Sequence, residues 1–133
     1  MRYALALYCS DLTDSSHDFI PVGVIVVDEN AKRYAFQGLQ RPPNMTQIDE
    51  ITQIMWNILP IALEQRFLEY TTEPNCNYYK ERIREYHGFI SQLIVDWSQS
   101  TICFSDSITL EGNEDIEEIT QKLFQEKVLR TLN

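Results

Sequence analysis

The chain of 133 residues is short of the residues that most catalytic motifs require. It contains 4 glycines and 2 histidines, and none of the signatures GxGxxG, GxxxxGK[ST], GxSxG or HExxH occurs. The few glycines argue against a loop that wraps around phosphate groups. The two histidines exclude most histidine-based metal sites. From the sequence we therefore expect no cofactor.

Cysteines are also few, and long apolar runs are absent. The three cysteines, Cys9, Cys76 and Cys103, are odd in number and widely spaced, and no CxxC pair occurs. This argues against a disulfide framework or a structural zinc site and favours a reducing cytoplasm. No apolar run is long enough to span a membrane. The first residues lack a small-residue cleavage site, so we predict a strand there and no signal peptide.

Basic residues are scarce relative to acidic ones. Lys and Arg total 11 against 20 Asp and Glu, which gives a net charge of −9. An acidic surface repels the phosphate backbone, so direct nucleic-acid binding is disfavoured, although a small basic groove stays open as an alternative. A length of 133 residues and 44% hydrophobic content predict a single globular domain over residues 1–133.

The apolar residues that are present predict a sheet at the start of the chain. The segment Phe19–Asp28, FIPVGVIVVD, is apolar at nearly every position, which is typical of a central strand covered on both faces. We predict flanking strands over Arg2–Cys9 and Lys32–Leu39, which give an antiparallel meander. The tight turn between the last two strands is predicted over Asp28–Ala31, where Asn30 is able to adopt the left-handed conformation. In the central strand we expect one face to carry Val22, Val24 and Val26 and the other Phe19, Ile25 and Val27. In the first strand we expect Tyr3, Leu5 and Leu7 opposite Ala4, Ala6 and Tyr8.

Helical spacing dominates the rest of the chain. We predict helices over Thr46–Thr71, Tyr78–Gln99 and Asn113–Leu132, with short strands at Thr101–Phe104 and Ser107–Leu110. The first helix should have a kink near Pro60 or be divided there into two. Its predicted buried face comprises Ile48, Ile51, Met55, Ile58, Leu59 and Ala62. The fold class is α+β: a three- to four-stranded, mostly antiparallel sheet packed by three to four helices.

One candidate for catalysis lies in the second predicted helix. Arg82 and His87 are separated by four residues, and this spacing resembles the signature of the HEPN ribonuclease superfamily. The resemblance implies a dimer in which His87 transfers a proton and Arg82 stabilises a charged phosphate. The pattern is short, the superfamily is all-helical and this chain is acidic. A coincidental pair on a helix of mixed charge is therefore the favoured interpretation.

Three further groups of residues have a functional and a structural interpretation. The loop residues Asp11, Asp14, His17 and Asp18 could bind a divalent metal, but a solvated loop is the favoured interpretation. The acidic run Glu111, Glu114, Asp115, Glu117 and Glu118 could contact a basic partner or imitate nucleic acid, but acids are also typical of a helix start. Tyr70, Tyr78 and Tyr79 could anchor a partner, but aromatic rings more often close a core.

The opening of the chain resembles a family of small bacterial proteins known as domain of unknown function 3037. The resemblance is carried by the apolar strand Tyr3–Tyr8, the polar loop after it and the run Phe19-Ile-Pro-Val-Gly-Val-Ile-Val, followed by helices, a short strand and the acidic helix from Glu114 to Leu132. It implies an accessory protein that acts through a partner and supplies no catalytic residue. We therefore expect a non-catalytic protein-interaction or regulatory module of a bacterial cytoplasm. The alternatives are a HEPN-like ribonuclease using Arg82 and His87 and an acidic inhibitor that mimics nucleic acid. A homodimer is an open alternative for the oligomeric state.

Overall fold

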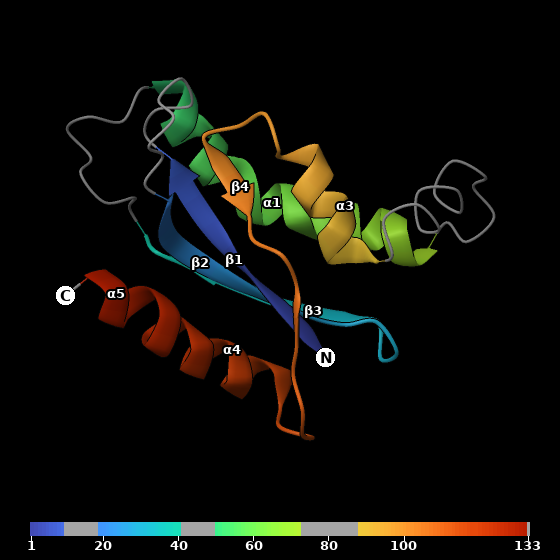
Figure 1. Ribbon diagram of the computed structural model, residues 1–133. Helices are drawn as coiled ribbons and strands as arrows, with labels where there is room; N and C mark the ends of the chain where they lie inside the picture. The colour runs from blue at the N-terminus through green and yellow to red at the C-terminus, as the bar shows by residue number, and fades with distance from the viewer. Residues whose placement is uncertain (10–18, 41–49, 73–87, 133) are drawn as a thin grey trace.

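The computed structural model describes residues 1–9, 19–40, 50–72 and 88–132. It has a five-stranded antiparallel sheet with the order β3-β2-β1-β4, in which β5 also pairs with β1. Helices α1 and α3 cover one face of the sheet, and the helical segment of α4, η2 and α5 covers the other (Figure 1). The predicted α+β class is confirmed. The strands are β1 (Arg2–Cys9), β2 (Phe19–Asp28), β3 (Arg33–Gly38), β4 (Ile102–Phe104) and β5 (Ile108–Thr109), and the helices are α1 (Glu50–Thr72), α3 (Phe89–Asp96), α4 (Ile116–Phe124), the π-helix η2 (Gln125–Leu129) and α5 (Arg130–Leu132).

Strand β2 is central, as its apolar sequence predicts, and both of its faces are covered. Ile25 and Val27 pack under α1 and α3, whereas Val24 and Val26 pack against α4 and η2. Val22 was predicted on the face of Val24 and Val26, and this is wrong, since it packs with Ile25 and Val27. The register with β1 shifts between Ala6 and Leu7, where β2 has one extra residue. Such a bulge reverses the facing of every residue beyond it.

The bulge lies next to Pro21, which has no backbone N–H to donate to the sheet. On β1 the predicted faces are confirmed: Ala4, Ala6 and Tyr8 pack under α1 and α3, and Tyr3 and Leu5 pack against α4. A Cβ atom on Gly23 would lie 3.0 Å from the Phe36 ring. This glycine therefore lets β2 and the aromatic side chain of β3 approach closely.

Strands β4 and β5 share one edge of the sheet, along β1. The Ser105 hydroxyl accepts a hydrogen bond from the Leu5 backbone N–H at 2.8 Å, and the Ser105 N–H donates to the Leu5 carbonyl at 2.9 Å. Ser105 thus continues the pairing of β1 between β4 and β5. The two short strands that the sequence predicted at Thr101–Phe104 and Ser107–Leu110 are both confirmed, with shorter bounds.

The turn between β2 and β3 differs from its prediction. Lys32, and not Asn30, has the positive φ of 53°. The Asp28 side chain accepts a hydrogen bond from the Ala31 N–H at 3.2 Å, and the Lys32 N–H donates to the Glu29 carbonyl at 3.3 Å. These two contacts close the turn at Lys32, so the left-handed position falls two residues after Asn30.

Helix α1 is continuous from Glu50 to Thr72, so the predicted division into two helices is wrong. Pro60 lies inside it and is exposed. Proline removes the hydrogen bond to the carbonyl of residue 56, a loss that water can offset at an exposed position. Packing of the opposite side against the sheet holds the two halves in one helix. The predicted residues 46–49 of this helix lie outside the described part of the chain.

The other two predicted helices differ from the structure at particular residues. Gly88 was expected inside a helix over Tyr78–Gln99, but it has a positive φ of 126°, and α3 begins after it. Residues 78–87 of that prediction lie outside the described part of the chain. The last helix was predicted from Asn113, but its cap is Asp115, whose carboxylate accepts a hydrogen bond from the Glu118 N–H at 3.4 Å. Phe89, the first residue of α3, is fully buried. None of the helices within the described ranges combines the length and the hydropathy that a membrane span requires.

Candidate protein-interaction surface

Helix α1 has two apolar faces, and only one of them is buried. The inner face packs against the sheet through a row of fully or nearly fully buried residues: Thr52, Trp56, Leu59, Leu63 and Phe67. The Trp56 indole N–H donates a hydrogen bond to the Leu39 carbonyl at 3.0 Å, and the hydroxyl oxygens of Thr52 and Thr101 lie 2.8 Å apart. These polar contacts fix the rotation of α1 about its own axis.

The outer face of α1 carries five large aliphatic side chains in solvent. Their exposed fractions range from 46% to 70%, and we call this set the outer stripe: Ile51, Ile54, Ile58, Ile61 and Leu68. The steps along the stripe alternate between three and four residues, with Gln65 at the one intervening position. This is the spacing of a helix that packs along another helix. Isolated exposed aliphatic residues are ordinary, but a continuous row of them marks an interaction site.

The sequence analysis missed this surface. It placed Ile51 and Ile58 on the buried face, which is wrong, since both are exposed. Residues 51–68 contain two interleaved apolar rows, and helical periodicity alone does not say which row meets the sheet. A count would have indicated the stripe, because the segment has more aliphatic residues than one face of a helix holds. The row that packs against the sheet is the one with Trp56 and Phe67. Their rings contact the rings of Phe36 and Tyr34 of β3, respectively.

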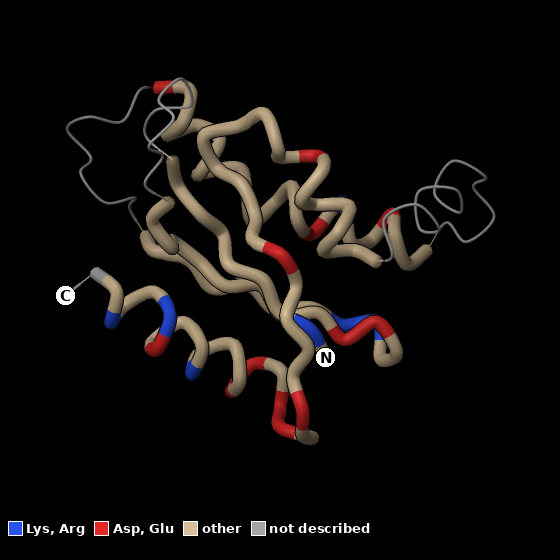
Figure 2. The backbone as a smooth tube through the Cα atoms, viewed as in Figure 1, with Lys and Arg blue, Asp and Glu red and all other residues tan. Residues whose placement is uncertain are grey.

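Charge avoids the outer stripe. Residues 51–63 include no charged side chain, although the whole chain has a net charge of −9. Figure 2 shows acidic and basic residues gathered in the β2–β3 turn and along the helical segment from α4 to α5. The flanks of the stripe carry Glu50 at one end and Glu64 near the other. An uncharged apolar row on an acidic protein favours a protein partner over a phosphate-bearing one.

The end of α1 is tied to α3 by an ion pair. The Arg66 guanidinium donates to one Asp96 carboxylate oxygen through Nε at 3.1 Å and through Nη2 at 2.9 Å. Arg66 also lies 3.4 Å from Glu69, one turn further along α1. Aromatic packing joins the same elements, with the Phe67 and Phe89 ring centroids 5.0 Å apart. The outer stripe is therefore carried by a helix that is anchored to both the sheet and its neighbour.

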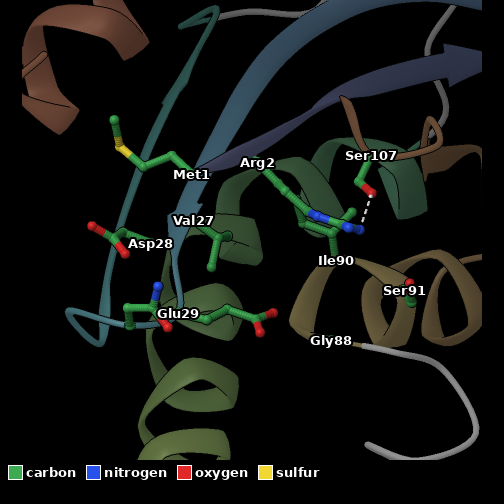
Figure 3. Close-up of a pocket in the computed structure, with 10 residues that line it drawn as sticks. Met1, Arg2, Val27, Asp28, Glu29, Gly88, Ile90, Ser91 and Ser107 are labelled. Atoms are coloured by element: carbon green, nitrogen blue, oxygen red, sulfur yellow. Dashed lines mark hydrogen bonds between the residues drawn. The ribbon is translucent and has the colours of Figure 1, made fainter. Parts of the chain in front are cut away.

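A small pocket lies where the chain start, the β2–β3 turn and α3 meet (Figure 3). Its volume is about 190 Å³, below the roughly 300–1,000 Å³ of ligand pockets. Arg2 in its wall donates to the Ser107 hydroxyl at 3.3 Å, and the Glu29 carboxylate accepts from the Phe89 N–H at 3.0 Å. Both charged groups already make contacts within the protein, so we assign no ligand to this pocket.

Tyr70 is half-buried beside the same Glu29. Its pKa is raised to about 12, first because burial disfavours the phenolate and then because of the charge of Glu29 and a hydrogen bond to that carboxylate. The rings of Tyr70 and Phe89 lie 5.4 Å apart. Tyr70 therefore closes the core, as the structural interpretation of the aromatic residues predicted. Tyr78 and Tyr79 lie outside the described residues.

The candidate catalytic and metal-binding residues fall on parts of the chain that the structure does not describe. These are Arg82 and His87, and the loop residues Asp11, Asp14, His17 and Asp18. Within the described ranges, no group of three His, Cys, Asp or Glu side chains is placed to hold a metal ion. Of the acidic run, Asp115 caps α4, and Glu117 and Glu118 lie in its first turn, where they face the positive end of the helix dipole.

Two of the three cysteines, Cys9 and Cys103, are described, and neither takes part in a disulfide within the described ranges. Cys9 is buried, and burial raises the pKa of Cys103 above its usual value, with a smaller contribution from Cys9. A raised thiol pKa lowers the reactive thiolate fraction of Cys103 at neutral pH, so we assign it no catalytic role. Comparison with known proteins gives no match to a family model, a curated protein or a solved structure.

Proposed function

We propose that the protein is a non-catalytic interaction or regulatory module that binds a protein partner through the outer stripe of α1. The observation that carries this proposal is the row of five aliphatic side chains, each about half or more exposed, on one face of a continuous helix. Burying such side chains is worth about 1.5–3 kcal/mol each when burial is complete. Exposing these side chains to water is unfavourable in free energy, and binding a partner that buries them is favourable.

The setting we propose is a bacterial cytoplasm. Two features support it: the odd number of widely spaced cysteines, and the lack of a disulfide at the two cysteines that the structure describes. The resemblance to the domain of unknown function 3037 points the same way, since it implies an accessory protein and brings no catalytic residue. This resemblance stays a prediction.

A second function, RNA cleavage, rests on Arg82 and His87 and stays a prediction. Replacing His87 with Ala and measuring RNA cleavage tests it. Cleavage that disappears with this substitution would support a HEPN-like enzyme, whereas no cleavage by the wild type, or unchanged cleavage by the variant, would remove it. Nucleic-acid mimicry, the third alternative, predicts that DNA or RNA competes with the protein for its partner.

Affinity capture from the native host tests the interaction through the outer stripe. Three baits are compared: the wild type, the double variant Ile58→Lys/Ile61→Lys, and the control Ile108→Lys. Ile108 is a matched control because it is half exposed but lies on β5, away from α1. We expect the wild type and the control to retain a partner that the double variant loses. Identical capture by all three baits would contradict the proposal.

A further inference from the structure

We infer that the outer stripe of α1 binds the outer stripe of a second copy of this chain, with the two helices antiparallel. This inference rests on the proposed function and names its partner. It depends on two features of the described residues: the symmetry of the stripe and the positions of the charges beside it.

The stripe is symmetric about its own midpoint, which lies between Leu59 and Pro60. Reversing the helix direction about this point places Ile58 on Ile61 of the partner copy and Ile51 on Leu68 of the partner copy. The same operation places Ile54 on Gln65 of the partner copy, so all six positions of the row from residue 51 to residue 68 find a counterpart. A two-fold interface requires this kind of self-complementary patch. The alternation of three- and four-residue steps supplies the spacing for side chains to interdigitate.

The charges beside the stripe favour two antiparallel helices over two parallel ones. In a parallel pair, Glu64 would lie against Glu69 of the partner copy, because flanking positions five residues apart meet across a parallel seam. In the antiparallel pair, Glu64 lies against Asn57 of the partner copy and Glu50 lies against Thr71 of the partner copy. The antiparallel arrangement therefore brings no like charges together among these described residues. It also joins two acidic proteins through the part of α1 that has no charge.

Gln65 interrupts the apolar row at one position. In the antiparallel pair it lies against Ile54 of the partner copy, outside the two central layers, which pair Ile58 with Ile61. The stripe spans about 26 Å along the helix, from the rise of 1.5 Å per residue. A contact of this length is at the small end of specific interfaces. We therefore expect a dimer that dissociates within the micromolar range.

Analytical ultracentrifugation of complementary variants tests both the dimer and its direction. The wild type and the control Ile108→Lys should form dimers at micromolar concentrations. Ile58→Lys and Ile61→Glu should each be monomeric over the same range, with dissociation constants raised about tenfold or more. Mixing these two variants should restore a dimer, because the antiparallel pair sets Lys against Glu at one contact and keeps Ile against Ile at the other. Far-UV circular dichroism checks that each variant is folded.

Each contrary outcome removes a distinct part of the inference. A wild type that stays monomeric throughout the micromolar range would overturn self-association. A wild-type dimer whose single variants dissociate, but whose mixture stays monomeric, would overturn the antiparallel arrangement. Dimers formed equally by all four proteins would place the interface on another face. The proposed function has its own test, and it is contradicted only by capture that does not depend on the stripe. A monomeric protein that captures a different partner through Ile58 and Ile61 would contradict self-association but support the proposed function.

Discussion

The Glu29 carboxylate accepts a hydrogen bond from the backbone N–H of Phe89, at 3.0 Å and across 60 residues of sequence. Glu29 lies in the β2–β3 turn, and Phe89 is the first residue of α3. Gly88, which precedes the helix, makes no side-chain cap. A helix start leaves N–H groups without partners, and here a side chain from the sheet supplies one acceptor. The contact joins the sheet to the helix layer that carries the outer stripe.

Removing this acceptor should destabilise the protein. Glu29→Ala should lower the free energy of unfolding by about 1 kcal/mol, the usual effect of losing a helix cap. Glu29→Gln should lose less, because its amide oxygen still accepts a hydrogen bond. Urea denaturation measures both, with Glu111→Gln, in the exposed segment between β5 and α4, as the control. Equal stability of the wild type and Glu29→Ala would show that the contact contributes nothing.

Gly88 and Gly112 offer a matched comparison of backbone strain with and without crowding. Both have positive φ, 126° and 105°. A Cβ atom at residue 88 would lie 2.6 Å from a Glu29 carboxylate oxygen, whereas one at residue 112 would meet no atom within 4 Å. Gly112→Ala should therefore cost about 1–3 kcal/mol from strain alone.

Gly88→Ala should cost more than Gly112→Ala, because it also displaces the Glu29 carboxylate that caps α3. Thermal melting of the two variants gives the comparison directly. The double variant Gly88→Ala/Glu29→Ala separates the two causes. Because Gly88→Ala already disturbs the Glu29 contact, the double variant should lose less stability than the two single variants lose in total. Equal melting temperatures for the two alanine variants would contradict the role of the contact.

Stability should fall at alkaline pH because of Tyr70. Its pKa is raised to about 12 in the folded protein from the ordinary value of 10.0. The folded state therefore holds the phenolic proton more tightly than the unfolded state does. The stabilisation is complete below pH 10 and is lost as the pH rises from 10 toward 12. Tyr34, whose pKa is also raised by burial and then by Glu64, contributes in the same direction.

Urea denaturation as a function of pH measures this effect. Tyr70→Phe should show a shallower loss of stability between pH 10 and 12 than the wild type, because the titrating group is gone. Spectrophotometric titration of tyrosine absorbance provides an independent reading of the raised pKa. A wild type and a Tyr70→Phe variant with the same alkaline profile would contradict the assignment.

The strained position in the β2–β3 turn should improve with a residue that tolerates it. Lys32 has a φ of 53° and is exposed. Lys32→Asn and Lys32→Gly should each raise the free energy of unfolding by about 0.5–1 kcal/mol, since both residues adopt the left-handed conformation more readily. Ala31→Gly, one residue earlier and without positive φ, is the control and should give no gain. Thermal melting checks all three, and a gain at Ala31 as large as at Lys32 would contradict the explanation.

Local pattern determined most of the sheet and the class of fold. The apolar run of β2, the alternation of β1 and the polar turn after Asp28 predicted three antiparallel strands in the observed order, because strand pairing follows from residues close in sequence. The acids at the start of α4 likewise marked a helix start, within a few residues. The bulge at Val22 escaped prediction, since it depends on how β1 and β2 meet around Pro21.

Within the described residues, local pattern was therefore enough to predict the strands, the approximate positions of the helices and the cover on both faces of β2. Contacts between distant segments were needed to show that Trp56 and Phe67, and not Ile51 and Ile58, turn toward the sheet. Such a contact also sets the start of α3 after Gly88, where the Glu29 carboxylate occupies the space that a side chain would need. Both cases have one cause. Periodicity records how a segment could be buried, whereas the choice between two apolar faces, or between a helix and its cap, depends on atoms from distant parts of the chain.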